Sequence, residues 1–309
     1  MGKLISISTS TQFCAVIGNP VAHSLSPAIH NAAYEHLGLD FVYVASKVED
    51  VKSALAGVRA LSNFRGLSVT IPHKIEIMKY VDEISDTDKA IGSINTVIHE
   101  GDKLIGIGTD GPGAMKALVD GGVEIAGRNV LILGAGGASR AISFTLAMKA
   151  RAAVITLLDL NEQLLKALKS DLISATKEVI KAELLTEKTL SDAMKRADII
   201  INCTSIGMHP KEDASIIPPE MFRPGQIVFD IVYTPLETKL IKDAKACGLK
   251  VIPGVEMFIN QAALQFEHFT GVKAPVKVMR KVGVKSLLDS SSELPLGRKR
   301  CQREQRRVR

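Results

Sequence analysis

The stretch from residue 130 to residue 141, VLILGAGGASRA, constrains the fold of this chain more than any other. Its four aliphatic residues predict a buried strand, and the apolar spacing after the glycines, through Met148, predicts a helix. Gly134 permits a sharp turn, and Gly136 lets a ligand approach the backbone closely. Because free N–H groups at a helix start favour an anion, this turn is typical of a dinucleotide-binding fold.

The residues after this turn support the same interpretation. A second strand is predicted at residues 153–158, and it ends in Asp159, 25 positions after Gly134. The dinucleotide fingerprint has an acidic residue at about this distance, where it binds ribose hydroxyls. Ser139 stands at the third small position and is small enough for close helix–strand packing. The alternative is a tight strand–helix turn that binds no ligand.

Strands and helices alternate along both halves of the chain, which predicts an α/β fold with mainly parallel sheets. The other predicted strands are residues 13–17, 41–45, 66–70, 94–99, 103–107, 199–202, 226–230 and 251–252, of which 94–99 and 103–107 form a hairpin. Helices are predicted at residues 27–37, 49–61, 112–120, 161–174, 237–247 and 254–269. A second domain is expected to begin near residue 128.

The net charge of +6 comes entirely from the C-terminal end of the chain. Seven Arg and Lys residues and one Glu lie between residues 298 and 309, so the charges of residues 1–297 sum to zero. From about residue 286 the chain is Ser-rich and then Arg-rich without apolar periodicity, which predicts a disordered, solvated basic tail. We therefore expect no nucleic-acid partner and no membrane partner.

Composition also limits the compartment and the chemistry. No apolar run approaches the roughly 18 residues of a membrane span, and the N-terminus is too polar for a signal peptide. The four cysteines, Cys14, Cys203, Cys247 and Cys301, form no CxxC motif, and no histidine pair has metal-ligand spacing. These observations predict a cytoplasmic protein without a metal site.

Polar side chains gather in the front half near predicted strand ends, where open parallel sheets bind their ligands. Lys74 follows one strand, and Asn95, Thr109 and Asp110 lie near two others. Some of the candidate residues also have an ordinary structural explanation. Lys74 can be a solvated surface residue, and Asp110 and Ser26 can cap helices.

Seven segments together resemble the shikimate dehydrogenase family. They are residues 24–27 (SLSP), 68–74 (SVTIPHK), 93–96 (SINT), 108–110 (GTD), the glycine turn, 202–208 (NCTSIGM) and 254–262 (GVEMFINQA). They occur in the family's order and cover roughly residues 13–270, whereas the basic tail lies outside the resemblance. Ser68 departs from the asparagine that many members carry.

The resemblance implies the reversible, NAD(P)H-dependent reduction of 3-dehydroshikimate to shikimate, a step of chorismate and aromatic amino-acid biosynthesis. It also implies an N-terminal substrate domain, residues 1–110, and a Rossmann-type cofactor domain, residues 111–253, with a cleft between them. The last helix, at about residues 254–280, would return to the substrate domain, and residues 286–309 would form the tail.

Matched position by position, the resemblance implies that Lys74 and Asp110 are the catalytic pair. A lysine ammonium can stabilise negative charge on a ketone oxygen and donate a proton, while the aspartate orients it. The implied substrate-binding residues are Ser24, Ser26, Thr70, Asn95, Gln261 and Tyr233. The implied cofactor-binding residues are Gly134, Ala135, Gly136, Gly137, Ala138, Asp159, Thr204, Ser205, Gly207, Met208, Ile231, Gly254 and Met257. The two methionines could instead be core residues, and His23 and His73 are expected only to shape loops.

The cofactor is where this sequence differs most from the family pattern. Family habit implies NADP, because NADP-using members carry Asn-Arg-Thr or Asn-Arg-Ser after the second strand of the cofactor domain. This chain has Asp159-Leu160-Asn161-Glu162 there, with two carboxylates and no arginine. Two negative charges would repel the 2′-phosphate of NADP, so the sequence favours NAD.

Two alternatives to a shikimate dehydrogenase stay open. A quinate or dual quinate/shikimate dehydrogenase shares the fold and most motifs and fits a preference for NAD somewhat better. A non-catalytic sensor of shikimate-like ligands could carry a basic tail, but it would not need both Lys74 and Asp110. The expected partner is a small-molecule substrate, and the expected assembly is a monomer or a homodimer.

Overall fold

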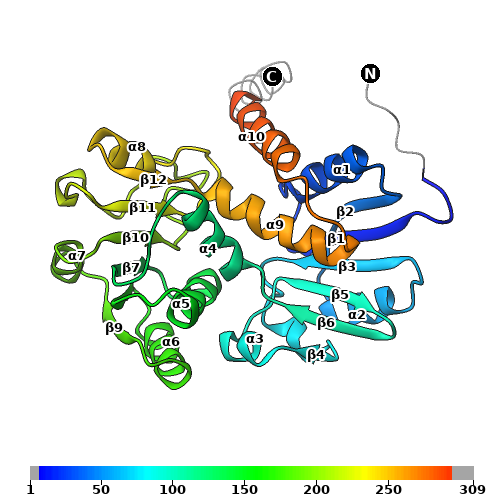
Figure 1. The fold of residues 1–309 in the computed structure, drawn as a ribbon, viewed down its shortest axis with the longest axis horizontal. Helices are drawn as coiled ribbons and strands as arrows, with labels where there is room; N and C mark the ends of the chain where they lie inside the picture. Colours follow the sequence, from blue (N-terminus) through cyan, green and yellow to red (C-terminus); the bar gives the residue numbers. More distant parts are fainter. Residues whose placement is uncertain (1–6, 294–309) are drawn as a thin grey trace, which may run out of the picture.

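Two lobes, each built around a six-stranded sheet, make up the computed structural model, which describes residues 7–293 (Figure 1). The first sheet has the order β2-β1-β3-β5-β6-β4. Its strands are β1 (Gln12–Gly18), β2 (Phe41–Lys47), β3 (Phe64–Val69), β4 (Glu83–Ile84), β5 (Thr96–Glu100) and β6 (Lys103–Ile107). Of these strands β5 alone runs against its neighbours. The helices of this lobe are α1 (Ser26–Leu37), α2 (Val51–Arg59), the 3-10 helix η1 (Glu76–Lys79) and α3 (Asp86–Ile91).

The second sheet is parallel throughout and has the order β12-β11-β10-β7-β8-β9. Its strands are β7 (Asn129–Leu133), β8 (Val154–Asp159), β9 (Val179–Leu184), β10 (Ile199–Asn202), β11 (Ile227–Asp230) and β12 (Lys250–Ile252). Around it lie α5 (Gly137–Lys149), α6 (Glu162–Ala175), α7 (Glu187–Met194), the 3-10 helix η2 (Pro219–Met221) and α8 (Lys239–Ala246). This is the strand order of a dinucleotide-binding sheet, whose winding reverses between its first and fourth strands, here β7 and β10. The predicted α/β fold with a Rossmann-type second half is confirmed.

Two helices, α4 (Asp110–Asp120) and α9 (Gly254–Thr270), pass between the lobes (Figure 1). A Cβ atom on Gly113 of α4 would lie 2.7–2.9 Å from atoms of Gln261 on α9. A Cβ atom on Gly111 would lie 2.5 Å from the carbonyl oxygen of Ala141 on α5. Glycine therefore lets α4 pack closely against both helices, and this packing positions Asp110 relative to both lobes.

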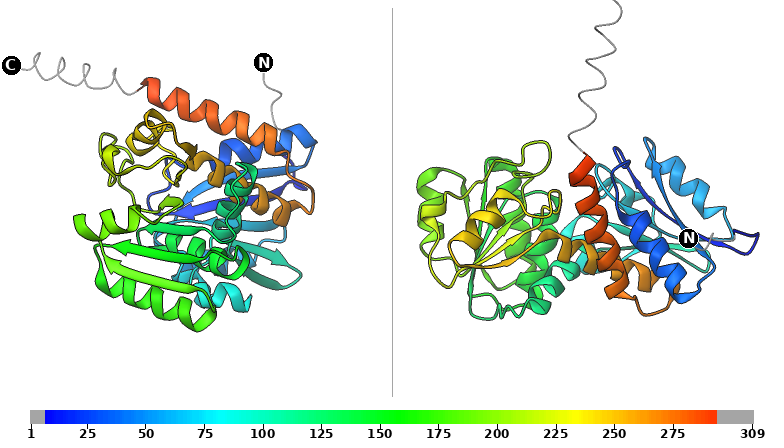
Figure 2. Two further views of the ribbon diagram at one scale, coloured as in Figure 1. Left: turned by 60° about the vertical axis from the view of Figure 1, so that its left-hand side comes forward. Right: turned by 90° about the horizontal axis from the view of Figure 1, so that it is seen from above.

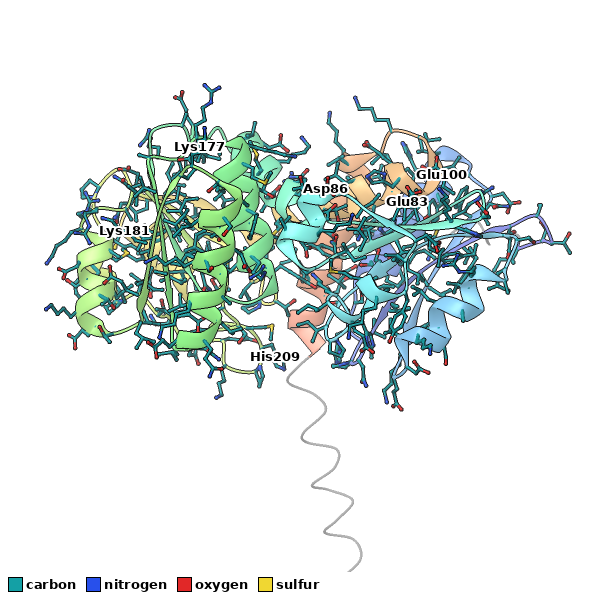
Figure 3. The ribbon with its side chains drawn as sticks, turned by 90° about the horizontal axis from the view of Figure 1, so that it is seen from below. Glu83, Asp86, Glu100, Lys177, Lys181 and His209 are labelled. Atoms are coloured by element: carbon teal, nitrogen blue, oxygen red, sulfur yellow. The ribbon has the colours of Figure 1, made fainter. Side chains whose placement is uncertain are left out.

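Helix α3 also links the two lobes. The Nε of Arg140 on α5 donates to the carbonyl oxygen of Ile91 at 2.7 Å, at the C-terminal end of α3. Arg140 also pairs with Asp171 on α6 at 2.8 Å. Figure 3 shows Asp86, the first residue of α3, on the part of the first lobe that adjoins the second. Through its hydrogen bond to Ile91, the guanidinium of Arg140 therefore connects the second lobe to the first.

Aliphatic and aromatic side chains fill the interior of both lobes, and α9 contributes to each. Val255, Phe258 and Phe266 pack with α1 and β2 in the core of the first lobe. Met257, on another face of the helix, is 7% exposed and packs in the core of the second lobe. None of the helices within residues 7–293 combines the length and apolar character that a bilayer crossing needs.

The C-terminal region differs from the sequence-based prediction in two ways. The single helix expected over residues 254–280 is instead two, α9 and α10 (Val276–Glu293), because Gly271 adopts φ +70° at the end of α9. The disordered tail expected from residue 286 is also wrong for residues 286–293, which are helical. Helix α10 lies against α1 and α9 (Figure 2). Leu287 of this helix is 3% exposed and packs in the core of the first lobe, although the sequence around it is Ser-rich. The basic cluster at residues 298–309 lies outside the described residues.

Besides α10 and the two 3-10 helices η1 and η2, four elements went unassigned in the sequence analysis, namely β4, α3, β9 and α7. In β9, an edge strand, Ile180 is the one buried residue, so no alternating apolar pattern is visible. β4 and α3 have only two and six residues, too few to carry a periodic signal.

Leu287→Ala tests whether α10 belongs to the core. The variant should lower the free energy of unfolding by about 2–4 kcal/mol, because it leaves a cavity among apolar neighbours. Leu288, 55% exposed, is the matched control, and Leu288→Ala should change that free energy by less than about 0.5 kcal/mol. Chemical denaturation measures both, and equal effects would contradict the packing of α10.

Candidate active site

Lys74 lies on a turn after β3 that is tied to neighbouring segments. The N–H of Thr70 donates to a carbonyl oxygen of β1 at 2.9 Å, and the N–H of Ile94 donates to the carbonyl oxygen of Lys74 at 3.0 Å. The Nε2 of His73, a buried side chain, lies 2.8 Å from the carbonyl oxygen that precedes α2, at Val48. The His73 side chain therefore connects the loop that carries Lys74 to the segment before α2.

Lys74 and Asp110 form a half-buried ion pair. The Nζ of Lys74 lies 2.5 Å from Oδ2 of Asp110, and the two side chains are 24% and 14% exposed. Asp110 is the first residue of α4, where the helix favours a negative charge. Its side chain does not cap the helix. It is instead bonded to Lys74 and, through Oδ1, to Nδ2 of Asn95 at 2.9 Å.

Asn95 is the centre of the polar cluster and is 3% exposed. Its Oδ1 accepts from the backbone N–H of Thr109 at 2.7 Å. Its Nδ2 donates to Oγ1 of Thr109 and Oδ1 of Asp110, both at 2.9 Å, and to Oε1 of Gln261 at 3.3 Å. The structure thus brings Lys74, Asp110, Asn95 and Gln261 into one network.

Ser24 and Thr70 lie on the segments that follow β1 and β3, and Ser26 is the first residue of α1. Because β1 and β3 pair in parallel, these segments leave the same edge of the first sheet. Glycine at position 18 lets the segment after β1 approach Thr70 closely, since a Cβ atom there would lie 2.4 Å from Cγ2 of Thr70. Ser26 does not cap α1, because the residue before it occupies the cap position. Its N–H donates to Oγ of Ser24 at 3.3 Å.

Tyr233 and Gln261 are both placed by Phe258 of α9. The rings of Tyr233 and Phe258 stack with centroids 4.9 Å apart, and burial raises the pKa of Tyr233. The Nε2 of Gln261 donates to the carbonyl oxygen of Phe258 at 3.0 Å, which turns its Oε1 toward Asn95.

Tyr43 and Gln265 join this network, and the sequence analysis missed them. The phenol of Tyr43 donates to Oγ of Ser68 at 2.6 Å, and Ser68 donates to Oε1 of Gln265 at 2.7 Å. A signal for Gln265 was present, because it lies four residues after Gln261 and hence on the same face of the helix. Tyr43 gave none, since an aromatic residue in an alternating strand is typical of a core.

The glycine turn lies between β7 and α5, at the switch point of the second sheet. Gly134 has φ +105°, and a Cβ atom there would lie 3.1 Å from the carbonyl oxygen of Cys203, so this position requires glycine. A Cβ atom on Gly136 or Gly137 would meet no described atom within 4 Å. Gly136 has φ −76°, so neither its backbone nor its neighbours require glycine. The remaining reason is room for a ligand at the N–H groups that begin α5, so these residues fit a dinucleotide.

Asp159, at the end of β8, turns its carboxylate toward the glycine turn. Its Oδ2 accepts from the N–H of Ala135 at 2.6 Å, and its Oδ1 accepts from the N–H of Asn161 at 2.7 Å. The negative charge is therefore fixed beside the turn at the carboxyl edge of the second sheet.

The loop after β10 borders the same turn and carries the predicted residues Thr204, Ser205, Gly207 and Met208. Oγ1 of Thr204 donates to Oδ1 of Asn202 at 2.7 Å, and Nδ2 of Asn202 donates to Oδ1 of Asp230 at 2.9 Å. Burial raises the pKa of the Asp230 carboxyl. Ser205 and Met208 are exposed, and the N–H of Met208 donates to the carbonyl oxygen of Ser205 at 3.1 Å.

The last predicted cofactor residues lie where β11 and α9 meet. A Cβ atom on Gly254 would lie 2.5 Å from the carbonyl oxygen of Ile231, so glycine permits this contact. Met257 is buried in the second core, in agreement with its core alternative. Among residues 7–293, no group of three or more His, Cys, Asp or Glu side chains could hold a metal ion.

Comparisons with known proteins identify the family. The model of the shikimate dehydrogenase substrate binding domain matches residues 16–97, and that of the shikimate 5'-dehydrogenase C-terminal domain matches residues 254–282. The alanine dehydrogenase/PNT C-terminal domain matches residues 110–231. A shikimate dehydrogenase (NADP+) from Moorella thermoacetica is 39% identical over 297 residues, 96% of this chain and 100% of that relative. The chain belongs to the shikimate dehydrogenase family.

Solved structures of the family have the same fold. Shikimate 5-dehydrogenase from Listeria monocytogenes, in complex with shikimate and NAD, is 33% identical with a TM-score of 0.85, over 91% of this chain and 99% of that one. Quinate dehydrogenase from Corynebacterium glutamicum, in complex with NAD, is 27% identical with a TM-score of 0.83, over 89% and 99%. The family and the dehydrogenase class predicted from the sequence are confirmed.

Gly136→Ala should separate ligand space from packing. We expect its melting temperature to stay within about 2 °C of wild type, because the added methyl group meets open space. The KM for NAD(P) should rise about tenfold or more, because that group occupies room that a pyrophosphate needs. Gly254→Ala is the contrast, since its methyl group would meet a backbone oxygen and should lower the melting temperature. An unchanged cofactor KM in Gly136→Ala would contradict the role of the turn.

Proposed function

We propose that this chain catalyses the reversible, NAD(P)H-dependent reduction of 3-dehydroshikimate to shikimate, a step toward chorismate and the aromatic amino acids. The observation that carries the proposal is the ion pair of Lys74 and Asp110, 2.5 Å apart, within a network of neutral amides and hydroxyls. A ligand sensor would not need that pair. Residues 1–110, with the last helices, are assigned to the substrate, and residues 111–253 to the cofactor.

The proposed chemistry divides between the pair and its supports. When bound, NAD(P)H supplies the hydride that reduces the ketone carbon. The ammonium of Lys74 hydrogen-bonds the ketone oxygen, stabilises the negative charge that develops there and donates a proton to it. Asp110 orients the ammonium and compensates its charge, and Asn95 holds Asp110 through its other oxygen.

Neutral donors and acceptors suit a small acid with several hydroxyls. We assign its recognition to Ser24, Ser26, Thr70, Asn95, Gln261 and Tyr233. Asn95 and Gln261 are supported by their hydrogen bonds beside the ion pair, and Ser26 and Thr70 by their position after the adjacent parallel strands β1 and β3. The assembly stays a prediction, a monomer or a homodimer.

Lys74→Met should lower the kcat of shikimate oxidation by about 10²–10⁴-fold, the usual contribution of a general acid–base group. The KM for the cofactor should change by less than about threefold, because Lys74 is assigned to the substrate. The control is Lys79→Met, an exposed lysine at the end of η1, which should keep the wild-type kcat. Near-normal turnover of Lys74→Met in a steady-state assay would refute the assignment.

Quinate is the second candidate substrate, because the quinate dehydrogenase above has the same fold. The absorbance of reduced nicotinamide, followed with shikimate or quinate and with either cofactor, separates the two activities. Binding of shikimate without any cofactor reduction would favour the sensor instead.

We also propose NAD as the preferred cofactor. The carboxylate of Asp159 is fixed beside the glycine turn by two backbone N–H groups. Glu162 adds a second carboxylate and already pairs with Lys166 at 2.8 Å. Arg140, at the start of α5, is engaged with Ile91 and Asp171. This charge arrangement suits a ribose diol better than a 2′-phosphate.

The kcat/KM with NAD should exceed that with NADP by about tenfold or more, since repulsion between close like charges is about 1–4 kcal/mol near a protein surface. Asp159→Asn removes the charge at nearly constant size and should reduce this ratio. Asp198→Asn is the matched control, because Asp198 also binds a backbone N–H, that of Asn129 at 2.8 Å, but at the opposite edge of the sheet. A wild-type preference for NADP would overturn the proposal.

A further inference from the structure

Gln265 on α9 is buried beside the proposed site, and both the oxygen and the nitrogen of its side-chain amide form hydrogen bonds. It is 1% exposed and lies one helical turn after Gln261. Its Oε1 accepts from Oγ of Ser68 at 2.7 Å. Its Nε2 donates to the carbonyl oxygen of Asn95 at 3.0 Å and to Oγ1 of Thr96 at 2.9 Å. One side chain thus joins α9 to β3 and to the start of β5.

The carbonyl oxygen of Asn95 fixes the orientation of this amide. A carbonyl oxygen only accepts hydrogen bonds, so the NH₂ end of Gln265 must face it, and Oε1 must face Ser68. The hydroxyl of Ser68 must then donate to Oε1, which uses its single proton. Tyr43 must in turn donate to Ser68, at 2.6 Å. The carbonyl oxygen of Asn95 therefore sets the direction of the hydrogen bonds from Ser68 to Gln265 and from Tyr43 to Ser68.

A consequence for ligand recognition follows at Ser68. Its Oγ has no proton left to give, but after accepting from Tyr43 it keeps one lone pair. Ser68 and Thr70 are two residues apart at the end of β3, so they share one face of the strand. A ligand group that reaches Ser68 must therefore donate a hydrogen bond, as a hydroxyl does and a carboxylate cannot.

The other end of Gln265 supports the ion pair. By holding the carbonyl oxygen of Asn95 and the hydroxyl of Thr96, Gln265 fixes the segment whose side-chain amide reaches Asp110. Asp110 in turn holds the ammonium of Lys74. Loss of the Gln265 amide would thus affect the hydrogen bonding of Ser68 and the alignment of Asp110 together.

We propose that Gln265 is a positioning residue for the dehydrogenase reaction: it presents Ser68 as a hydrogen-bond acceptor to a substrate hydroxyl and holds Asn95 in place for Asp110. This inference rests on the proposed function, because both effects concern the oxidation of shikimate.

The test begins with Gln265→Met, which keeps the length of the side chain and removes its hydrogen bonds. The KM for shikimate should rise and the kcat should fall, each about fivefold or more, as expected for lost buried hydrogen bonds. The KM for NAD(P) should stay within about twofold of wild type, because the amide contacts the substrate half only.

Gln226 in the second lobe provides a matched control. It is 2% exposed, its Nε2 donates to the carbonyl oxygens of Met194 and Ala197 at 2.9 Å, and its Oε1 accepts from the N–H of Arg223 at 2.8 Å. Gln226→Met therefore loses as many buried hydrogen bonds. It should lower the melting temperature but leave kcat and the KM for shikimate within about twofold of wild type.

Gln265→Glu gives an independent measurement if the methionine variant folds poorly. The ionised carboxylate keeps an acceptor for Ser68 but has no donor for the carbonyl oxygen of Asn95, whereas the protonated acid has one. Burial raises the pKa of such a carboxyl, so kcat relative to wild type should recover as the pH falls. The same ratio for Gln265→Met should not depend on pH.

The outcomes distinguish the inference from the function on which it rests. If the wild type oxidises shikimate, and Gln265→Met matches Gln226→Met in kcat and KM while the Glu variant shows no recovery at low pH, Gln265 is only structural and the function stands. If the wild type oxidises shikimate with neither cofactor, the proposed function fails and this inference fails with it.

Discussion

The buried side-chain amide of Asn95 is the interaction on which the geometry of the site depends. It binds the backbone N–H and the hydroxyl of Thr109, just before α4, and the carboxylate of Asp110, the first residue of α4. It also reaches Gln261 on α9. The residue just before β5 is thereby connected to both helices that pass between the lobes. The Asn95 amide thus helps to hold Asp110 in the position in which it pairs with Lys74.

Close helix packing makes those hydrogen bonds possible. Gly113 lets α4 approach the backbone of Gln261, and Gly111 lets it approach α5 on its other side. A larger side chain at either position would push α4 away, and a shift of about 1 Å is enough to break a hydrogen bond. In the glycine turn the missing side chain makes room for a ligand instead of a helix, because no described atom fills the space beside Gly136.

The parts of the fold that could be predicted are those with a strong local pattern. The strand–turn–helix at Gly134 and the alternation of strands and helices gave the fold class, and seven motifs gave the family. The edge strand β9 and helix α10 could not be predicted, because each depends on a few buried side chains, such as Ile180 and Leu287, in a polar sequence. Gln265 was missed although it lies one helical turn after Gln261, because its partners Ser68, Asn95 and Thr96 are far away in the chain.

The proposed proton donation by Lys74 also accounts for the neutral groups that surround the pair. While Lys74 is charged, the pair has no net charge, and a half-buried position is tolerated. Once Lys74 has given up its proton, Asp110 is left as an uncompensated carboxylate with a side chain only 14% exposed. The Nδ2 donor of Asn95 then stabilises that charge, since hydrogen bonds to ionised groups are the stronger ones. A second carboxylate in place of Asn95 would instead repel Asp110 after Lys74 has given up its proton, when the Asp110 carboxylate needs a hydrogen-bond donor.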